Sequence, residues 1–327
     1  MRDIFNDRDV DKAVARGGLA DCGRLQVRLP GVFGFCGGVL RALRLLDEAL
    51  DAPGDRRIWL LGEIIHNDTV NNHFRDKGAR VLSERDAETI FDCASPNDTA
   101  VIPAFGLPQD LEMRVRAFFE PQGVVVDTTC GYVKRIWRFV QDMAAEHRTV
   151  LVHGKPSHPE TRAILSRAQA AGGAAIVIPT VKDTARVANA LVSGACGDLP
   201  TEWIGSADSA GIRRVALAYQ TTMLCSETAG IEAVLRQIVC KEGGDLRSAD
   251  TVCRATQDRQ DAARTECAGD CDLSIVVGGF SSSNTSQLHR LAQDSGPAFF
   301  IANAEALKLH EIRHYEPSSG HILTTPD

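Results

Sequence analysis

The chain has 327 residues, of which 44% are hydrophobic and 24% are charged. At about 100–200 residues per domain, this length predicts two or three domains and excludes a disulfide-stapled mini-protein, a collagen and a disordered tail. The 36 Lys and Arg residues against 43 Asp and Glu residues give a net charge of −7, so we expect no nucleic-acid partner, and any anionic ligand must be bound locally.

Short β-branched apolar runs alternate with segments of helical spacing along the chain. Because the runs lack polar alternation, they predict strands that are covered on both faces. Strand and helix in alternation predict an α/β fold with parallel sheets and crossover helices, either as one large sheet or as several small ones. The clearest runs are residues 57–65, 99–106, 123–127, 149–155, 174–180, 215–222, 273–280 and 298–303.

The N-terminal segment has no apolar signal-peptide core, and no apolar run is long enough to span a membrane. We therefore expect a cytoplasmic protein with no membrane partner. Ten cysteines in a chain of this length are too few for a secreted disulfide scaffold, and they favour a reducing compartment with a metal or redox role.

Three of these cysteines share one setting. Cys36, Cys130 and Cys253 each precede a segment of helical pattern and are separated by about the length of a small α/β domain, so they suggest three similar units. A helix N-terminus is expected to lower a thiol pKa and favour the metal-binding thiolate. None of the three has the C-x₂₋₄-C partner typical of zinc sites, whereas three ligands to a four-iron cluster would leave one iron open. Scattered structural cysteines are the alternative interpretation.

Polar residues gather where the predicted strands end, which is where open α/β sheets bind ligands. A lone histidine there is usually structural, and a Ser/Asn cluster before a helix is usually a cap. Together, however, imidazoles, hydroxyls, an amide and helix N-termini can bind a diphosphate, and a carboxyl facing it could have a raised pKa and deliver protons. These residues are His66, His153, His158, Glu160, Thr221, Thr222, Ser281, Ser282, Ser283 and Asn284.

Eight motifs from about residue 26 onward resemble, in order and spacing, the 4-hydroxy-3-methylbut-2-enyl diphosphate reductase family, in its plant and cyanobacterial-like branch. The motifs are FGFCGGVLRAL, GEIIHNDTVNNHF, VIPAFGLP, VVDTTCGYVKRIW, VHGKPSHPET, YQTTML, DTVCRATQDRQDA and VVGGFSSSNTSQL.

The resemblance implies a cloverleaf of three small parallel-sheet α/β domains around a central [4Fe–4S] cluster. The cysteines of the family motifs match Cys36, Cys130 and Cys253 here. We expect an N-terminal extension at 1–25 and domains at 26–129, 130–250 and 251–327.

The resemblance also implies an activity, the last step of the non-mevalonate isoprenoid pathway. The allylic hydroxyl of the substrate would bind the open iron. Two electrons from a ferredoxin or flavodoxin, with two protons, would then expel it as water and leave isopentenyl or dimethylallyl diphosphate. By motif position, Glu160 would relay protons and Thr221 or Thr222 would position the hydroxyl, while the diphosphate would be bound by His66, His158, Ser282, Ser283 and Asn284.

Two features depart from the family pattern. One branch of the family has a diphosphate-binding histidine where this chain has Phe105, which cannot donate a hydrogen bond. The sequence also stops before a Gly/Ser-rich SGAS-like segment that supplies a further serine in the family, which indicates either a truncated gene product or a diverged paralogue with a more open pocket. Two alternatives follow: a cluster-bearing paralogue that reduces or binds another substrate, and a zinc-binding or metal-free interaction module.

Overall fold

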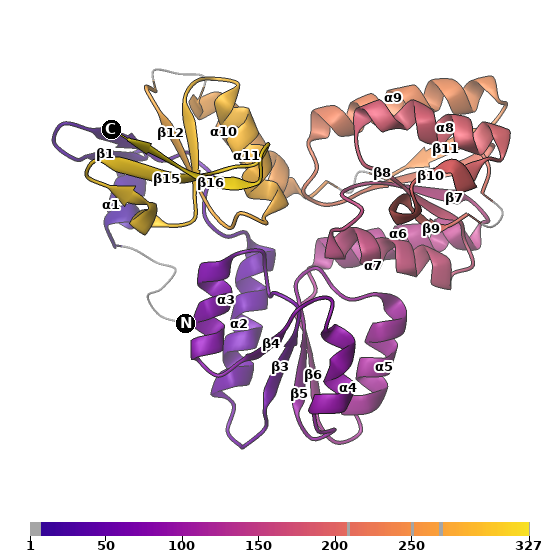
Figure 1. Ribbon diagram of the computed structural model, residues 1–327, viewed down its shortest axis with the longest axis horizontal. Coiled ribbons are helices and arrows are strands. Elements are labelled where there is room, and N and C mark those ends of the chain that lie inside the picture. The colour runs from indigo at the N-terminus through magenta and orange to yellow at the C-terminus, as the bar shows by residue number, and fades with distance from the viewer. Residues whose placement is uncertain (1–7, 208–209, 250–251, 268–270, 327) are drawn as a thin grey trace.

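The computed structural model describes residues 8–207, 210–249, 252–267 and 271–326, apart from the Cys267 side chain. Its chain folds into three lobes, each with its own β-sheet, arranged around a common centre (Figure 1). None of the described helices combines the length and apolar character needed to cross a bilayer.

The first lobe is a four-stranded parallel sheet in the order β4-β3-β5-β6 with helices on both faces. Ile58 and Leu60 pack against one pair of helices, α2 and α3, while Trp59 and Leu61 face the opposite pair, α4 and α5. This burial on both faces explains why the strands are apolar without alternation. The elements are α2 (Gly37–Asp51), β3 (Ile58–Leu61), α3 (Asp68–Asp76), β4 (Arg80–Leu82), α4 (Ile90–Cys93), β5 (Thr99–Ile102), α5 (Gln109–Phe119) and β6 (Val124–Asp127).

The second lobe is a five-stranded sheet in the order β11-β10-β7-β8-β9, in which only β9 is antiparallel. Leu151 faces α8 and α9, whereas Val150 and Val152 face α6 and α7. The elements are α6 (Gly131–Ala145), β7 (Thr149–His153), α7 (Pro159–Ala170), β8 (Ala175–Ile178), α8 (Thr184–Ser193), β9 (Ile204–Ser206), β10 (Arg214–Tyr219), α9 (Cys225–Lys241) and β11 (Asp245–Ser248).

The third lobe has a mixed sheet, which differs from the all-parallel expectation. Strands β12 and β13 are parallel, but β14, β15 and β16 join antiparallel, because short turns connect them and leave no room for a crossover helix. The elements are α10 (Arg254–Cys267), β12 (Ser274–Val277), α11 (Ser283–Gln293), β13 (Ala298–Ile301), β14 (Leu307–Lys308), β15 (Glu311–Glu316) and β16 (His321–Pro326).

A short N-terminal unit precedes the lobes. It consists of α1 (Arg8–Ala15) and an antiparallel hairpin of β1 (Leu19–Asp21) and β2 (Gln26–Arg28). We propose that the lobes are domains bounded near 26–129, 130–250 and 251–327. Two details bear on the boundaries: the hairpin spans residue 25, and Val252 packs in the core of the second lobe.

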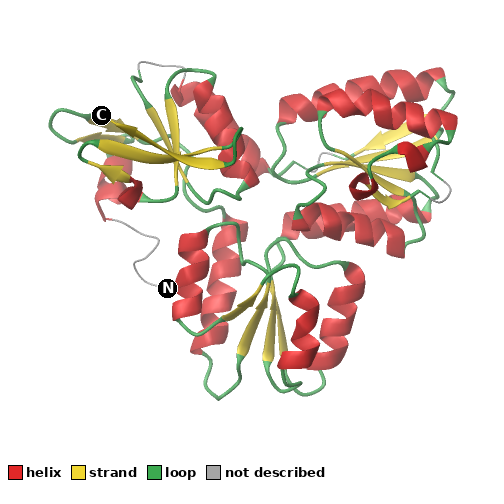
Figure 2. Ribbon diagram, viewed as in Figure 1, coloured by secondary structure: helices red, strands yellow, loops and turns green. Residues whose placement is uncertain are grey.

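The α/β architecture with three small sheets is confirmed, and all eight predicted strands are present. Loops that carry candidate residues follow the carboxyl ends of β3, β7, β10 and β12. In the first lobe, the strand ends point toward the centre of the molecule (Figure 2).

Candidate active site where the three lobes meet

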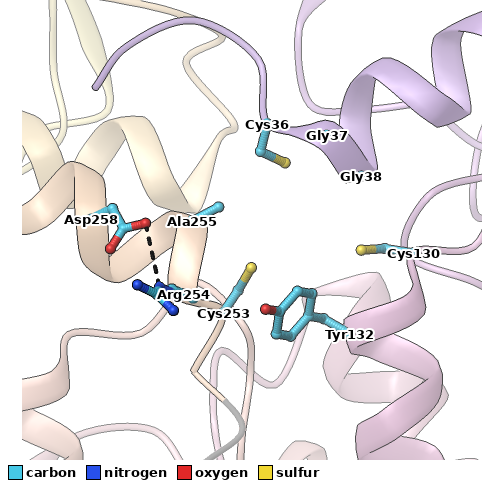
Figure 3. Close-up of a pocket in the computed structure, with 9 residues that line it drawn as sticks. All are labelled: Cys36, Gly37, Gly38, Cys130, Tyr132, Cys253, Arg254, Ala255 and Asp258. Atoms are coloured by element: carbon cyan, nitrogen blue, oxygen red, sulfur yellow. Dashed lines mark ion pairs between the residues drawn. The ribbon is translucent and has the colours of Figure 1, made fainter. Parts of the chain in front are cut away.

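The three singled-out cysteines line one cavity of about 300 Å³ at the junction of the lobes. Cys36 and Cys130 are the N-cap residues of α2 and α6, and Cys253 directly precedes α10. Each lobe therefore contributes one thiol from the start of a helix, and the three sulfur atoms point into a shared space (Figure 3).

The electrostatics of these thiols differ from the sequence expectation. Burial raises the pKa of Cys130 and of Cys253, and this outweighs the N–H groups at the start of each following helix, which favour the thiolates. The helix N–H groups lower both thiol pKa values as expected, but burial has the larger effect, so the net shift is upward. The neighbouring thiols also raise the pKa of Cys130 and of Cys253, because negative charges close together repel one another. All three thiols can therefore ionise together only if positive charge lies among them.

Gly38 keeps the space between two of the thiols open. A Cβ at this position would lie 2.8 Å from the Cys130 Sγ and 3.8 Å from the Cys36 Sγ. Among the residues that the structure describes, no three His, Cys, Asp or Glu side chains converge closely enough to bind a single metal ion. A donor set of three separated thiols around a cavity fits a multi-iron group better than one zinc ion.

A buried carboxyl lies beside the thiols. Glu160, 1% exposed, accepts hydrogen bonds from the Thr221 N–H at 2.7 Å and from the Thr221 hydroxyl at 2.8 Å. Burial raises the pKa of Glu160 to about 7, although both hydrogen bonds oppose the rise. The Thr221 carbonyl accepts from the Cys253 N–H, and Glu160 contributes to the raised pKa of Cys130. The proton-carrying pair is thus tied to the thiol cavity.

Sheet topology explains how Glu160 and Thr221 meet. Glu160 follows β7 and Thr221 follows β10, and these adjacent strands continue to opposite sides of the sheet. Such a switch point opens a crevice at the carboxyl ends of the strands. Thr222 accepts from the Gln220 amide at 2.8 Å, whereas Thr221 donates to Glu160, so the two threonines have different environments.

Two histidines form the rim of the site. His158 caps α7, and its Nδ1 accepts the Glu160 N–H, so the neutral ring carries its proton on Nε2. Burial lowers the pKa of His158 to about 3. His66 follows β3, and its ring lies 5.0 Å from that of His158 between centroids. The Phe105 ring stacks on the His66 ring, with centroids 4.4 Å apart, and meets His158 edge-on. Phe105 therefore packs against both histidines at the position where one branch of the family has a hydrogen-bond donor.

The third lobe brings its serine loop to the same rim. A Cβ on Gly279 would lie 2.1 Å from the His66 carbonyl oxygen, so only glycine permits this approach of the loop to the first lobe. Ser282 caps α11 by accepting the Thr285 N–H. The Ser283 hydroxyl and the Asn284 side-chain oxygen are buried without a hydrogen-bond partner, as expected for groups that await a polar ligand.

Sequence reasoning missed three residues of this site. Gln220 is fully buried and accepts from the Lys155 N–H and the Thr161 hydroxyl, which joins the β7 and β10 loops. Tyr132 lines the thiol cavity. Glu63 lies within hydrogen-bond distance of His66. The adjacency of Gln220 to Thr221 was an available signal for that residue, whereas Glu63 had none in the sequence. The remaining candidates, His153 and Ser281, have no observed role at the rim.

Comparison with known proteins gives one answer. Residues 27–319 match the family model described as LytB protein. A Nostoc relative named 4-hydroxy-3-methylbut-2-enyl diphosphate reductase is 33% identical over 317 residues, which cover 93% of this chain and 77% of the relative. The Gloeobacter violaceus protein of the same name is 34% identical over 321 residues, covering 93% and 75%.

Two solved structures agree. The structure of (E)-4-hydroxy-3-methyl-but-2-enyl diphosphate reductase, the terminal enzyme of the non-mevalonate pathway, has 26% identity and a TM-score of 0.58, covering 86% of each chain. The Plasmodium falciparum E-1-hydroxy-2-methyl-but-2-enyl-4-diphosphate reductase shares the fold, with a TM-score of 0.64 at 23% identity over 84% of this chain and 76% of its own. The chain therefore belongs to the LytB family.

Proposed function

We propose that this protein is a 4-hydroxy-3-methylbut-2-enyl diphosphate reductase that forms isopentenyl and dimethylallyl diphosphate. The observation that carries the proposal is the cavity into which three thiols converge beside the buried Glu160–Thr221 pair. Family membership and the names of the relatives support the same reaction.

The reaction breaks one allylic C–O bond, forms one C–H bond and releases water, so it consumes two electrons and two protons. We propose that Cys36, Cys130 and Cys253 hold a [4Fe–4S] cluster. Bound there, such a cluster supplies the electrons and one iron without a protein ligand, a Lewis acid for the departing hydroxyl. A ferredoxin or flavodoxin, as a one-electron donor, would reduce it.

Glu160 supplies the protons of the reaction. With a pKa of about 7, this carboxyl is close to half-protonated at neutral pH, so it can both take up and deliver a proton there. Its hydrogen bond to the Thr221 hydroxyl gives the proton a path of one step toward the cavity, because a hydroxyl accepts and donates in turn. We propose that Thr221 passes the proton, while Thr222, held by Gln220, orients the substrate.

The diphosphate is placed at the rim. His158 offers an Nε2–H without carrying charge, since its Nδ1 already accepts the Glu160 N–H. The unpartnered Ser283 hydroxyl and Asn284 oxygen lie on the loop that Gly279 brings against His66. We propose His66, His158, Ser282, Ser283 and Asn284 as the residues that bind the diphosphate. Rotation of the Asn284 side chain would turn its oxygen away and let its amide NH₂ donate to the diphosphate.

An anaerobic assay tests the proposal. The full chain is purified without oxygen, given the hydroxylated allylic diphosphate and a chemically reduced one-electron mediator, and the products are separated by chromatography. We expect isopentenyl and dimethylallyl diphosphate from wild type and none from Cys130→Ser. Absence of both products from a preparation that holds about four irons per chain would overturn the proposed substrate.

A further inference from the structure

We propose that Glu63 is a positioning residue that holds His66 in its cationic form, so that His66 is the charged donor and His158 the neutral donor of the diphosphate site. The inference deepens the proposed function and rests on it for the identity of the anion.

The contact between Glu63 and His66 is short and sheltered. The Glu63 Oε2 lies 2.8 Å from the His66 Nδ1, and the two side chains are 31% and 11% exposed. Both residues belong to the loop between β3 and α3. This loop is rigid, because the buried Asn71 side chain accepts from the Ile64 N–H and donates to the Ile65 carbonyl. A carboxylate this close to a ring nitrogen accepts its proton, so the geometry assigns the Nδ1–H of His66 to Glu63.

The ring has little freedom to turn away from this partner. Phe105 stacks on the His66 ring with centroids 4.4 Å apart and planes 20° apart, and His158 meets the ring edge-on. With Phe105, His158 and Glu63 in contact with the ring, its Nε2 edge is the part of His66 that can contact an anion.

Proton counting then separates the two histidines. His158 accepts a backbone N–H through Nδ1, so a single proton on Nε2 makes it a donor. His66 donates its Nδ1–H to Glu63, so it can donate to a phosphate oxygen through Nε2 only when the ring carries a second proton. Donation by both rings to one diphosphate therefore requires a cationic His66 and a neutral His158.

The groups that face His66 support this assignment. The carboxyls of Glu63, Glu84 and Glu160 and the ring of His158 all interact with it, from three different segments. Burial raises the pKa of Glu84, which Arg162 partly offsets, and burial also raises that of Glu160. Of these three carboxyls, Glu63 is the one within hydrogen-bond distance of the ring, so it is the principal counter-ion. A carboxylate beside an anion site would repel the anion unless a cation lies between them, and His66 occupies that place.

The test measures binding of inorganic diphosphate to the full chain by calorimetry at pH 6 and pH 8, in wild type and in Glu63→Gln. Glutamine keeps the hydrogen-bond acceptor and removes the charge. We expect similar affinities at pH 6, where an imidazolium is easier to form, and roughly tenfold weaker binding by the variant at pH 8. The matched control is Glu88→Gln, an exposed carboxylate of the same lobe that pairs with Arg114, and it should match wild type at both pH values.

Several results would overturn the inference. Tighter binding by Glu63→Gln at both pH values would mean that Glu63 only repels the anion, and an equal loss at both would mean a structural role. No measurable binding by wild type at pH 6 would contradict the charged site itself. In a His66→Asn background, Glu63→Gln should have no further effect, because the two residues act as a pair.

A second readout does not depend on binding. Nitrogen NMR of the His66 ring, assigned with His66→Asn, should show a protonated Nδ1 throughout the titration, and a neutral ring protonated on Nε2 would contradict the assignment. Neither measurement uses turnover. A chain that shows this pH dependence but reduces nothing would contradict the proposed function and leave the role of Glu63 intact.

Discussion

Replacement of Glu160 by glutamine separates a proton donor from a structural carboxyl. Glutamine has almost the same shape and can still accept the Thr221 N–H, so the loop after β7 should keep its conformation. What disappears is a buried carboxyl with a pKa of about 7, against 4.5 for an ordinary glutamate.

The size of the stability effect follows from that difference. A pKa raised in the folded state favours folding while the group is neutral, and this contribution is fully present below pH 4.5 and lost as the pH rises through about 7. Between pH 4 and pH 8 the loss amounts to about 3 kcal/mol, at 1.36 kcal/mol per pKa unit. Glu160→Gln lacks this loss. As the pH rises over that range, its free energy of unfolding, measured by urea unfolding, should therefore increase relative to that of wild type.

The same change should slow turnover roughly 10²-fold or more, because general acid catalysis commonly contributes that much. The rate of wild type should fall as the pH rises through about 7, where Glu160 loses its proton, and the variant should lose this limb. Anaerobic single-turnover rates over pH 6–9 measure both effects. Glu232→Gln, a half-buried carboxylate of the same lobe that binds Arg236, is the control. Unchanged single-turnover rates in Glu160→Gln would refute the role of proton donor.

Three further changes probe the cavity and the rim. Serine at any of the three cavity cysteines should abolish iron retention, whereas Cys240→Ser, at an exposed position, should retain it; equal iron contents would reject the ligand assignment. Gly38→Ala should lower iron retention because its Cβ would lie 2.8 Å from the Cys130 Sγ, whereas Gly37→Ala meets nothing within 4 Å; iron analysis of both decides. Gly279→Ala should raise KM more than it lowers kcat, since its Cβ would push the serine loop from His66, and a normal KM would contradict that contact.

The sequence predicted the strands that are buried on both faces, because such strands are continuous apolar runs. It did not reveal β11, in which Leu246 is the only buried residue, or the hairpin of β15 and β16, whose residues are largely polar or exposed. The mixed third sheet was missed for the same reason. Strands that bury few side chains give a weak apolar signal, both at an edge, as for β11, and inside the sheet, as for β15.

The candidate site was predicted in its parts but not in its connections. Motif position singled out Glu160 and Thr221, yet their hydrogen bonds arise from the order of β7 and β10 in the sheet, which no local pattern encodes. The raised thiol pKa values of Cys130 and Cys253 likewise depend on burial at the junction of lobes that are distant in sequence. Glu63 was overlooked because an acid three residues before a histidine gains meaning only from the contact that the folded loop makes.

The most direct test of the central claim is Mössbauer spectroscopy of the anaerobically purified chain, enriched with the iron isotope, with and without the hydroxylated allylic diphosphate. Three thiols from three lobes predict a four-iron cluster in which roughly one iron in four has a distinct environment, and only that iron should change when the substrate is added. Four equivalent irons that ignore the substrate, or a preparation that holds zinc in place of iron, would contradict the account.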